Sequence, residues 1–213
     1  AATLGEVTLA VADEEGSVTY FGTDRRGIEG ATAFDPPDVD GTLLSDRVLV
    51  SDPPPVLYER GFYGQPVGGR EEDDALQLSL VEAASLAREG ALSVDGSSAT
   101  ESTAAIEERG RAVEGERFDR RLSVYESLRV DGVVPKTGFK FGADFRTYRE
   151  VTSVDDLGHS EALVWVLPGE YVFEPRELAL YVRLAGGVRK RAVFALADDD
   201  GGMSWLSVDW VTP

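Results

Sequence analysis

The chain has no cysteine, one histidine, one methionine and only three lysines among its 213 residues. Without cysteine it can form neither a disulfide nor a thiolate metal site, which suits a cytoplasmic protein. No stretch approaches the roughly 20 apolar residues that a membrane-spanning helix needs, and no signal peptide is recognisable. We therefore expect a cytoplasmic protein without a membrane segment.

Acidic residues outnumber basic ones by 39 to 21, which gives a formal net charge of -18. A disordered acidic chain would have few apolar residues, whereas 42% of this chain is hydrophobic. A folded protein with an acidic, lysine-poor surface favours a halophilic source. The acidity argues against a nucleic-acid partner. That objection is softened by a concentration of basic residues in the last part of the chain: Lys136, Lys140, Arg146, Arg149, Arg176, Arg183, Arg189, Lys190 and Arg191.

Two segments near opposite ends of the chain share one pattern. Residues 6–21 align without gaps on residues 191–206, and each copy reads as a strand, an acidic turn and a second strand. The shared Ala-x-Asp favours duplication over coincidence. Residues 1–23 would then be the closing hairpin of a preceding repeat. Gly5 aligns with Lys190, so that earlier repeat lacks the lysine.

Between these hairpins, the composition predicts a linker and two modules. Residues 24–45 are rich in Gly, Asp and Pro and are typical of a linker. The first module, 46–113, should be α+β. We expect strands at 48–50 and 56–58, a helix at 75–89 capped by Asp73 or Asp74 and ended by Gly90, and a polar helix at 97–113.

The second module, 114–213, begins with a predicted helix at about 116–130. The pattern then changes to strands at 133–134, 143–148 and 162–166. Pro175 suits the first turn of a helix that runs to about residue 185. The second copy of the hairpin closes this mixed α/β module.

Three segments of this second module carry a specific signature: VYESLRVDGVVPKTGFKFGADFRTY at 124–148, HSEALVWV at 159–166 and RLAGGVRKRAVFALAD at 183–198. They resemble the archaeal tRNA-splicing endonucleases. The segment at 78–94 resembles, more weakly, the N-terminal module of that family. The resemblance implies an α+β fold, in which a small N-terminal module precedes a mixed-sheet catalytic domain related to restriction-endonuclease-like folds.

The resemblance also implies an activity. Members of this family excise introns by cutting a bulge–helix–bulge in precursor tRNA at both splice sites. The products carry 2′,3′-cyclic phosphate and 5′-hydroxyl ends, and neither a metal nor a cofactor is required. The matching positions assign Tyr148 as general base, His159 as general acid and Lys190 as the group that stabilises the transition state.

The residue types suit these roles. Cleavage of RNA by its own 2′-hydroxyl needs a proton acceptor, a proton donor for the leaving 5′-oxygen, and a positive charge for the phosphorane. Histidine exchanges protons near neutral pH, and lysine is a natural phosphate ligand. An unperturbed tyrosine has a pKa near 10, so it is a poor base unless nearby cations favour the phenolate. Candidates for such cations are Lys190, Arg149 and Arg189.

Further residues are expected to bind RNA or a partner chain. In the family, an arginine at the position of Arg183 sandwiches a flipped bulge base, and Trp205 could stack on the other side. The remaining RNA-binding candidates are Lys136, Lys140 and Arg149. The family also docks an acidic loop into a partner, which implies a homodimer formed through acidic loops and C-terminal strands. The loop residues would be Asp198, Asp199 and Asp200, with Asp13, Glu14 and Glu15 in the earlier repeat.

Other interpretations stay open. Arg183 would also serve in an ion pair, Trp205 in a core, and the acidic turns as solvated surface. The chain could be a non-catalytic structural subunit or an RNA-binding module, although the three catalytic residue types are present. A metal-dependent restriction-type nuclease would need an Asp followed by Glu-x-Lys. That motif is broken here, because Glu161 is followed by Ala162 and Leu163.

Overall fold

A computed structural model describes residues 7–12, 18–69, 75–198 and 201–211. The chain divides into two compact units. Unit 1 comprises residues 1–29, 135–149 and 159–213, and unit 2 comprises residues 30–134 and 150–158. Each contains helices and mixed strand pairing, so the predicted α+β fold class is confirmed.

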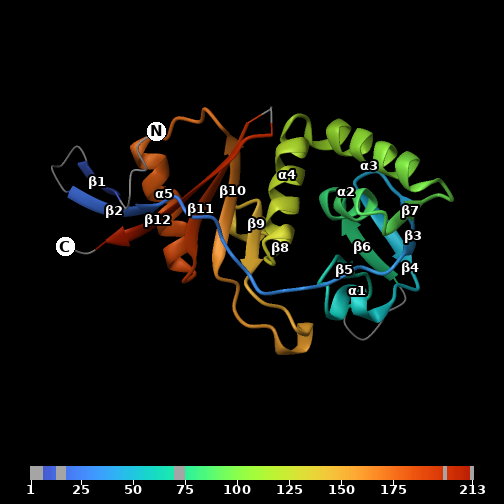
Figure 1. Cartoon of the computed structure of the whole chain (residues 1–213). Helices are drawn as coiled ribbons and strands as arrows, with labels where there is room; N and C mark the ends of the chain where they lie inside the picture. The colour runs from blue at the N-terminus through green and yellow to red at the C-terminus, as the bar shows by residue number, and fades with distance from the viewer. Residues whose placement is uncertain (1–6, 13–17, 70–74, 199–200, 212–213) are drawn as a thin grey trace. The chain divides into compact units, whose positions relative to one another are not determined.

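Unit 1 is built on a seven-stranded sheet with the order β1-β2-β12-β11-β10-β9-β8 (Figure 1). Strands β10 and β11 run parallel, whereas β1–β2, β2–β12, β12–β11 and β10–β9 are antiparallel pairs. The bounds are β1 (Val7–Ala12), β2 (Val18–Asp24), β8 (Val134–Thr137), β9 (Phe145–Tyr148), β10 (Ala162–Pro168), β11 (Arg191–Ala197) and β12 (Met203–Val211).

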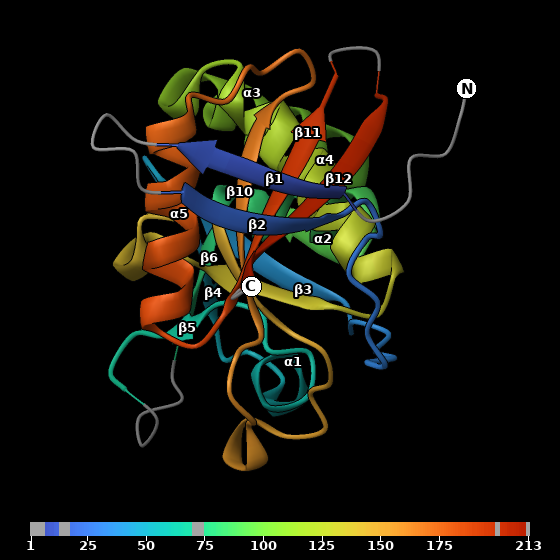
Figure 2. The same ribbon diagram turned by 90° about the vertical axis from the view of Figure 1, so that its left-hand side faces the viewer.

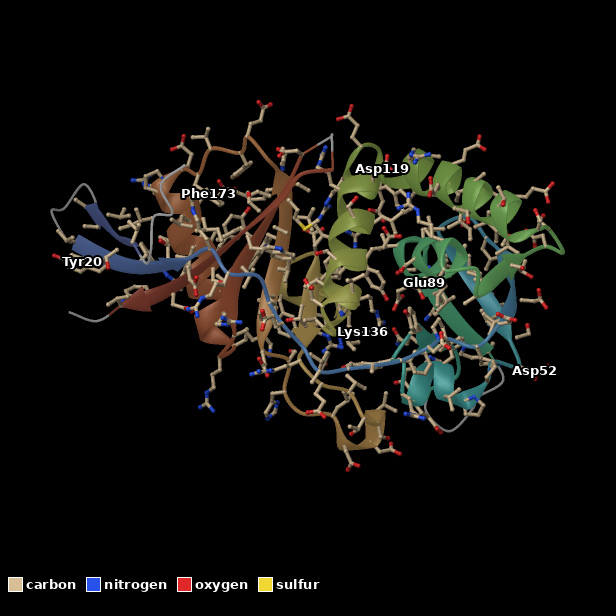
Figure 3. All side chains as sticks on the ribbon, in the orientation of Figure 1. Tyr20, Asp52, Glu89, Asp119, Lys136 and Phe173 are labelled. Atoms are coloured by element: carbon tan, nitrogen blue, oxygen red, sulfur yellow. The ribbon has the colours of Figure 1, made fainter. Side chains whose placement is uncertain are left out.

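One helix, α5 (Pro175–Gly187), covers one face of this sheet (Figure 1). It begins with proline in its first turn, as the sequence predicts. Its buried residues Leu178, Val182 and Ala185 pack in one core with Trp165 and Phe194 of the sheet. Phe173, labelled in Figure 3, precedes the helix and meets the ring of Phe194 edge-on at 4.7 Å between centroids.

The first hairpin, β1–β2, forms one edge of the sheet, because β2 pairs with β12 (Figure 2). The two strands of this pair occupy corresponding places in the two aligned segments. When the alignment of residues 6–21 on 191–206 is carried two residues further, residue 23 falls on residue 208, and Thr23 is the partner of Val208 in the sheet. The pairing of β2 with β12 is therefore symmetric, because Thr23 pairs with its own counterpart in the alignment, Val208.

Unit 2 contains a five-stranded sheet with the order β5-β6-β4-β3-β7. Helices α2, α3 and α4 pack against one another beside it. The bounds are β3 (Val39–Leu43), β4 (Arg47–Ser51), α1 (Pro55–Glu59), β5 (Gln65–Pro66), β6 (Ala75–Ser79), α2 (Leu80–Arg88), β7 (Leu92–Val94), α3 (Ala99–Glu114) and α4 (Arg117–Val130). Two short 3-10 helices, η1 (Phe139–Phe141) and η2 (Val154–Asp156), lie in unit 1 and unit 2, respectively.

The start of α2 differs from the prediction. Ala75–Ser79 is strand β6, paired with β4, and the helix begins only at Leu80. The helix cap is Ser79, whose side chain accepts a hydrogen bond from the Glu82 amide, so the predicted cap at Asp73 or Asp74 is wrong. Those two aspartates lie outside the described residues. The predicted end of the helix at Gly90 is confirmed by that residue's positive φ of 81°.

Two other segments are also corrected. Residues 56–58 belong to helix α1 and not to a strand, because Pro55 fits the first helical turn. Strand β3 lies within the predicted linker 24–45 and pairs with β4 and β7. The helices predicted at 97–113 and 116–130 are confirmed as α3 and α4. The structure groups α4 with unit 2, whereas the sequence places it in the second module.

Candidate active site

The ends of three neighbouring strands, β9, β10 and β11, lie side by side at one end of the unit 1 sheet. Thr147 of β9 pairs with Ala162 of β10, which pairs on its other side with Arg191 of β11. Because β9 is antiparallel to β10 and β11 is parallel to it, the end of β9 meets the beginnings of β10 and β11. Neighbouring strands lie about 4.8 Å apart. The register therefore brings Tyr148, Lys190 and the segment 159–161 to the same end of the sheet.

Lys190 is held in place by its backbone and its side chain. Its amide donates a hydrogen bond to the Ala185 carbonyl at 2.9 Å, and the preceding Arg189 has a positive φ of 57° that turns the chain out of α5. Its ammonium donates to the Ser160 carbonyl at 2.8 Å. This bond ties the lysine directly to the residue that follows His159.

The pKa of Lys190 is lowered from the ordinary value of 10.5. The first cause is partial burial, which disfavours the charged form, and the second is the positive charge of Arg146. Lys190 and Arg146 are thus neighbouring cations at this end of the sheet.

Tyr148 and His159 differ in exposure. Tyr148 is buried, with 7% of its surface exposed, whereas His159 is exposed on the segment that leads into β10. The Arg146 guanidinium lies over the Tyr148 ring, 5.6 Å from the ring centroid. Sequence reasoning missed Arg146. The two-residue spacing in strand β9, which places both side chains on one face, could have indicated it.

A hollow of about 280 Å³ lies beside Lys190, between α5 and β12, and is lined by Arg183 and Trp210 among others. The predicted partner of Arg183, Trp205, is not in this lining. Trp205 and Trp210 are five positions apart on β12, so they face opposite sides of the sheet. Trp205 is half-buried near Gly27, whereas Trp210 is 55% exposed. The structure brings Arg183 together with Trp210 and not with Trp205.

The other predicted RNA-binding residues differ in exposure. Lys136, labelled in Figure 3, lies on β8 and is only 8% exposed. Lys140 and Arg149 are exposed, on η1 and immediately after β9. A direct phosphate contact is therefore easier for Lys140 and Arg149 than for Lys136. For all three residues, binding to RNA stays a prediction.

Of the predicted interface residues, only Asp198 is described. It is exposed, and its amide donates a hydrogen bond to the Gly202 carbonyl at 2.8 Å, so it opens the turn between β11 and β12. The other five lie outside the described residues: Asp13, Glu14, Glu15, Asp199 and Asp200.

The described ranges contain neither a metal-binding cluster nor a membrane-spanning helix. No three side chains of the types His, Cys, Asp and Glu group closely enough to hold a metal ion there. None of the helices in those ranges has the length and apolar content to cross a membrane.

Comparison with known protein families gives independent information on both parts of the chain. The profile described as tRNA intron endonuclease, catalytic C-terminal domain, matches residues 118–205. The profile described as tRNA intron endonuclease, N-terminal domain, matches residues 39–105. The chain belongs to the tRNA intron endonuclease family. The catalytic-domain match includes Tyr148, His159 and Lys190.

The names of individual relatives agree with this family assignment of the tRNA intron endonuclease chain. The tRNA-splicing endonuclease of Natronomonas pharaonis is 59% identical over 211 residues, and that of Haloferax volcanii is 57% identical over 212. The enzyme of Methanococcoides burtonii is 38% identical over 203 residues. These alignments cover 99%, 99% and 92% of this chain but only 61%, 60% and 56% of the relatives. The chain thus spans about three fifths of the length of the relatives it matches. The halophilic source expected from the composition agrees with the organisms of the first two relatives, Natronomonas pharaonis and Haloferax volcanii.

Proposed function

We propose that this chain carries the active site of a tRNA-splicing endonuclease that cuts precursor tRNA at both ends of an intron. The observation that carries the proposal is the meeting of Tyr148, His159 and Lys190 at one end of the sheet, inside the segment that matches the catalytic domain. The substrate that this family implies is the bulge–helix–bulge of intron-containing precursor tRNA. A cytoplasmic location is part of the proposal.

The reaction follows from the three side chains. Tyr148 accepts the proton of the 2′-hydroxyl, and the freed oxygen forms a bond to the adjacent phosphorus. The bond from phosphorus to the 5′-oxygen breaks, and His159 gives a proton to that leaving oxygen. Lys190 stabilises the negative charge that builds up on the phosphorane. The products are a 2′,3′-cyclic phosphate and a 5′-hydroxyl.

The hollow beside Lys190 is suited to hold one base of the bulge. The exposed indole of Trp210 offers a stacking surface, and the guanidinium of Arg183 lies in the same lining. Stacking on an aromatic ring contributes about 1–3 kcal/mol per base, and an arginine adds a cation–π interaction. Trp210 takes the place in this proposal that the sequence suggested for Trp205.

We also propose that the full-length protein is a tandem duplication, of which β1–β2 closes the earlier repeat. The symmetric pairing of β2 with β12 supports this, because it joins equivalent positions as an isologous interface does. Val7 and Leu9 align with Ala192 and Phe194, which α5 covers. Val7 and Leu9 themselves are 36% and 38% exposed, as expected if the matching helix belongs to the earlier repeat.

The proposed assembly is a homodimer of such tandem chains, held by acidic turns such as the one that begins at Asp198 and by C-terminal strands. Light scattering on the full-length protein tests it. The expected mass is that of two chains, and a stable monomer that cleaves RNA normally would overturn the assembly but not the chemistry.

The activity itself is tested with a bulge–helix–bulge RNA and the full-length protein under single-turnover conditions, with the product ends mapped. Two cuts with cyclic phosphate and 5′-hydroxyl ends are expected. Binding without cleavage would indicate a structural or RNA-binding subunit. Products with 5′-phosphates would indicate a different nuclease chemistry.

A further inference from the structure

Arg146 occupies a particular place in the candidate active site. It lies opposite Leu163 in the β9–β10 register and on the same face of β9 as Tyr148. Its guanidinium stands over the Tyr148 ring, and its charge acts on the nearby Lys190. Arg146 therefore lies beside the proposed proton acceptor and the proposed phosphate ligand at once.

The charge of this arginine is not compensated by a carboxylate. Several other arginines of this acidic chain do pair with Asp or Glu, as Arg88 does with Glu107 and Arg111 with Asp119. Across the described part of the chain, no ion pair includes Arg146, and its Nε atom is buried without a hydrogen-bond partner. A buried donor without a partner costs about 1–3 kcal/mol, so such a group calls for an explanation.

Two cations that converge without a carboxylate leave a site ready for an anion. Lys190 and Arg146 repel each other in the free protein, and a phosphate between them would relieve that repulsion. The arginine side chain offers five N–H donors in a planar fork, which fits two oxygens of one phosphate. Preorganised donors of this kind act most strongly where charge develops in the transition state.

We infer that Arg146 is a fourth catalytic residue, whose guanidinium donates hydrogen bonds to a nonbridging oxygen of the scissile phosphate as the phosphorane forms. This inference rests on the proposed function. Arg146 takes no proton and forms no covalent bond. It shares with Lys190 the negative charge that the attack of the 2′-oxygen creates.

The test compares single-turnover cleavage of a bulge–helix–bulge RNA by the full-length protein and its Arg146→Gln and Arg146→Lys variants. Losing one oxyanion donor costs on the order of 10²–10³ in rate, which is the loss expected for Arg146→Gln. Arg146→Lys should fall between, because lysine keeps the charge but not the fork. The control is Arg25→Gln, which removes one charge from an exposed arginine of the same unit and should leave the rate unchanged.

A second measurement identifies the contact itself. Replacing one nonbridging oxygen of the scissile phosphate by sulfur should slow the wild-type protein for one of the two stereoisomers. Arg146→Gln should reduce that effect, because the contact it perturbs is already gone. A purely structural arginine, or one that only orients Tyr148, would leave the sulfur effect of both isomers as in the wild type.

The outcomes separate the two claims. If the wild type makes no cyclic phosphate, the proposed function fails, and this inference fails with it. If the wild type cleaves and Arg146→Gln cleaves equally fast, or the sulfur effects are unchanged, only the role of Arg146 is overturned. Thermal melting checks that the variants fold, and Arg146→Lys with both sulfur isomers decides the question if Arg146→Gln does not fold.

Discussion

At the scale of single residues, the candidate site contains charged and polar groups whose arrangement lowers the stability of the folded chain. Lys190 is partly buried beside a second cation, and Arg146 has a buried nitrogen with no acceptor. Elsewhere in the same chain, Arg88 and Arg111 lie next to carboxylates. Departures from the local rules of stability that cluster in one place are typical of functional sites.

Substitution of the three proposed catalytic residues should slow the chemical step. We expect His159→Ala, Tyr148→Phe and Lys190→Ala each to lower the single-turnover rate by roughly 10²–10⁴-fold, because a positioned acid, base or charge is lost. Binding of the RNA, measured by filter retention, should change little for His159→Ala and weaken modestly for Lys190→Ala. A wild-type rate for His159→Ala would contradict the mechanism.

The rate should also depend on pH through Lys190. Its pKa is lowered from 10.5, chiefly by burial and then by Arg146, so the ammonium is present at low pH and is lost as the pH rises through this lowered pKa. Cleavage should therefore decline on the alkaline side at a lower pH than an ordinary lysine would give. Lys190→Arg should keep its charge there and move the decline upward. Rates are corrected for RNA hydrolysis without protein. An identical alkaline decline in both proteins would show that another group sets it.

At the scale of elements, the sequence predicts most helices and strands, and the misses have identifiable causes. Residues 75–79 fit the helical pattern of the following segment, but pairing with β4 makes them a strand, and Ser79 supplies the later start. A three-residue apolar run at 56–58 suits either structure, and Pro55 decides for the helix. Pairing between distant strands is not visible in local periodicity.

The same limit applies to the site. Tyr148, His159 and Lys190 could be found because they sit in recognisable motifs. Arg146 stands two residues before Tyr148, so strand alternation could have indicated it. Trp210 could not be separated from ordinary strand residues until the structure placed it in one lining with Arg183. The sequence favours Trp205 of the same strand, but strand alternation puts it on the other face.

The two capping boxes offer a matched test of helix starts. Ser79 and Glu82 exchange hydrogen bonds at the start of α2, and the Glu82 carboxylate also accepts from the Gly64 amide in the core. The equivalent pair Ser98 and Glu101 starts α3 at the surface. Ser79→Ala should cost about 1–2 kcal/mol of unfolding free energy in urea titrations, and Ser98→Ala less. A larger loss for Ser98→Ala would contradict this ranking.

Gly110 of α3 provides a second test at this scale. A Cβ at this position would lie 2.3 Å from the Phe118 ring of α4. Alanine usually stabilises a helix by up to about 1 kcal/mol relative to glycine. Here the overlap should outweigh that gain, so Gly110→Ala should lower the melting temperature. The control is Gly186→Ala in α5, where the added Cβ would meet nothing within 4 Å beyond the neighbouring backbone of its own helix, and no loss is expected.

At the scale of the whole molecule, the excess of acidic residues sets the response to salt. An ion pair such as that of Arg111 with Asp119 (labelled in Figure 3) leaves about half of each side chain exposed, at 49% and 46%, and contributes little. Repulsion within a chain of net charge -18 is the larger effect, because the acidic residues far outnumber their partners. Salt therefore weakens a few small attractions and a greater total repulsion.

We expect the melting temperature to fall when the protein is moved from molar KCl to dilute buffer. At 1 M salt the Debye length is about 3 Å, and at 0.1 M it is about 10 Å, so the acidic groups repel over a longer range as salt is removed. Differential scanning calorimetry across a KCl series measures the trend. Sucrose at matched osmolality is the control, since it stabilises by exclusion from the surface and does not screen charge. Equal stability in dilute buffer and molar KCl, or full replacement of KCl by sucrose, would show that self-repulsion does not govern this fold.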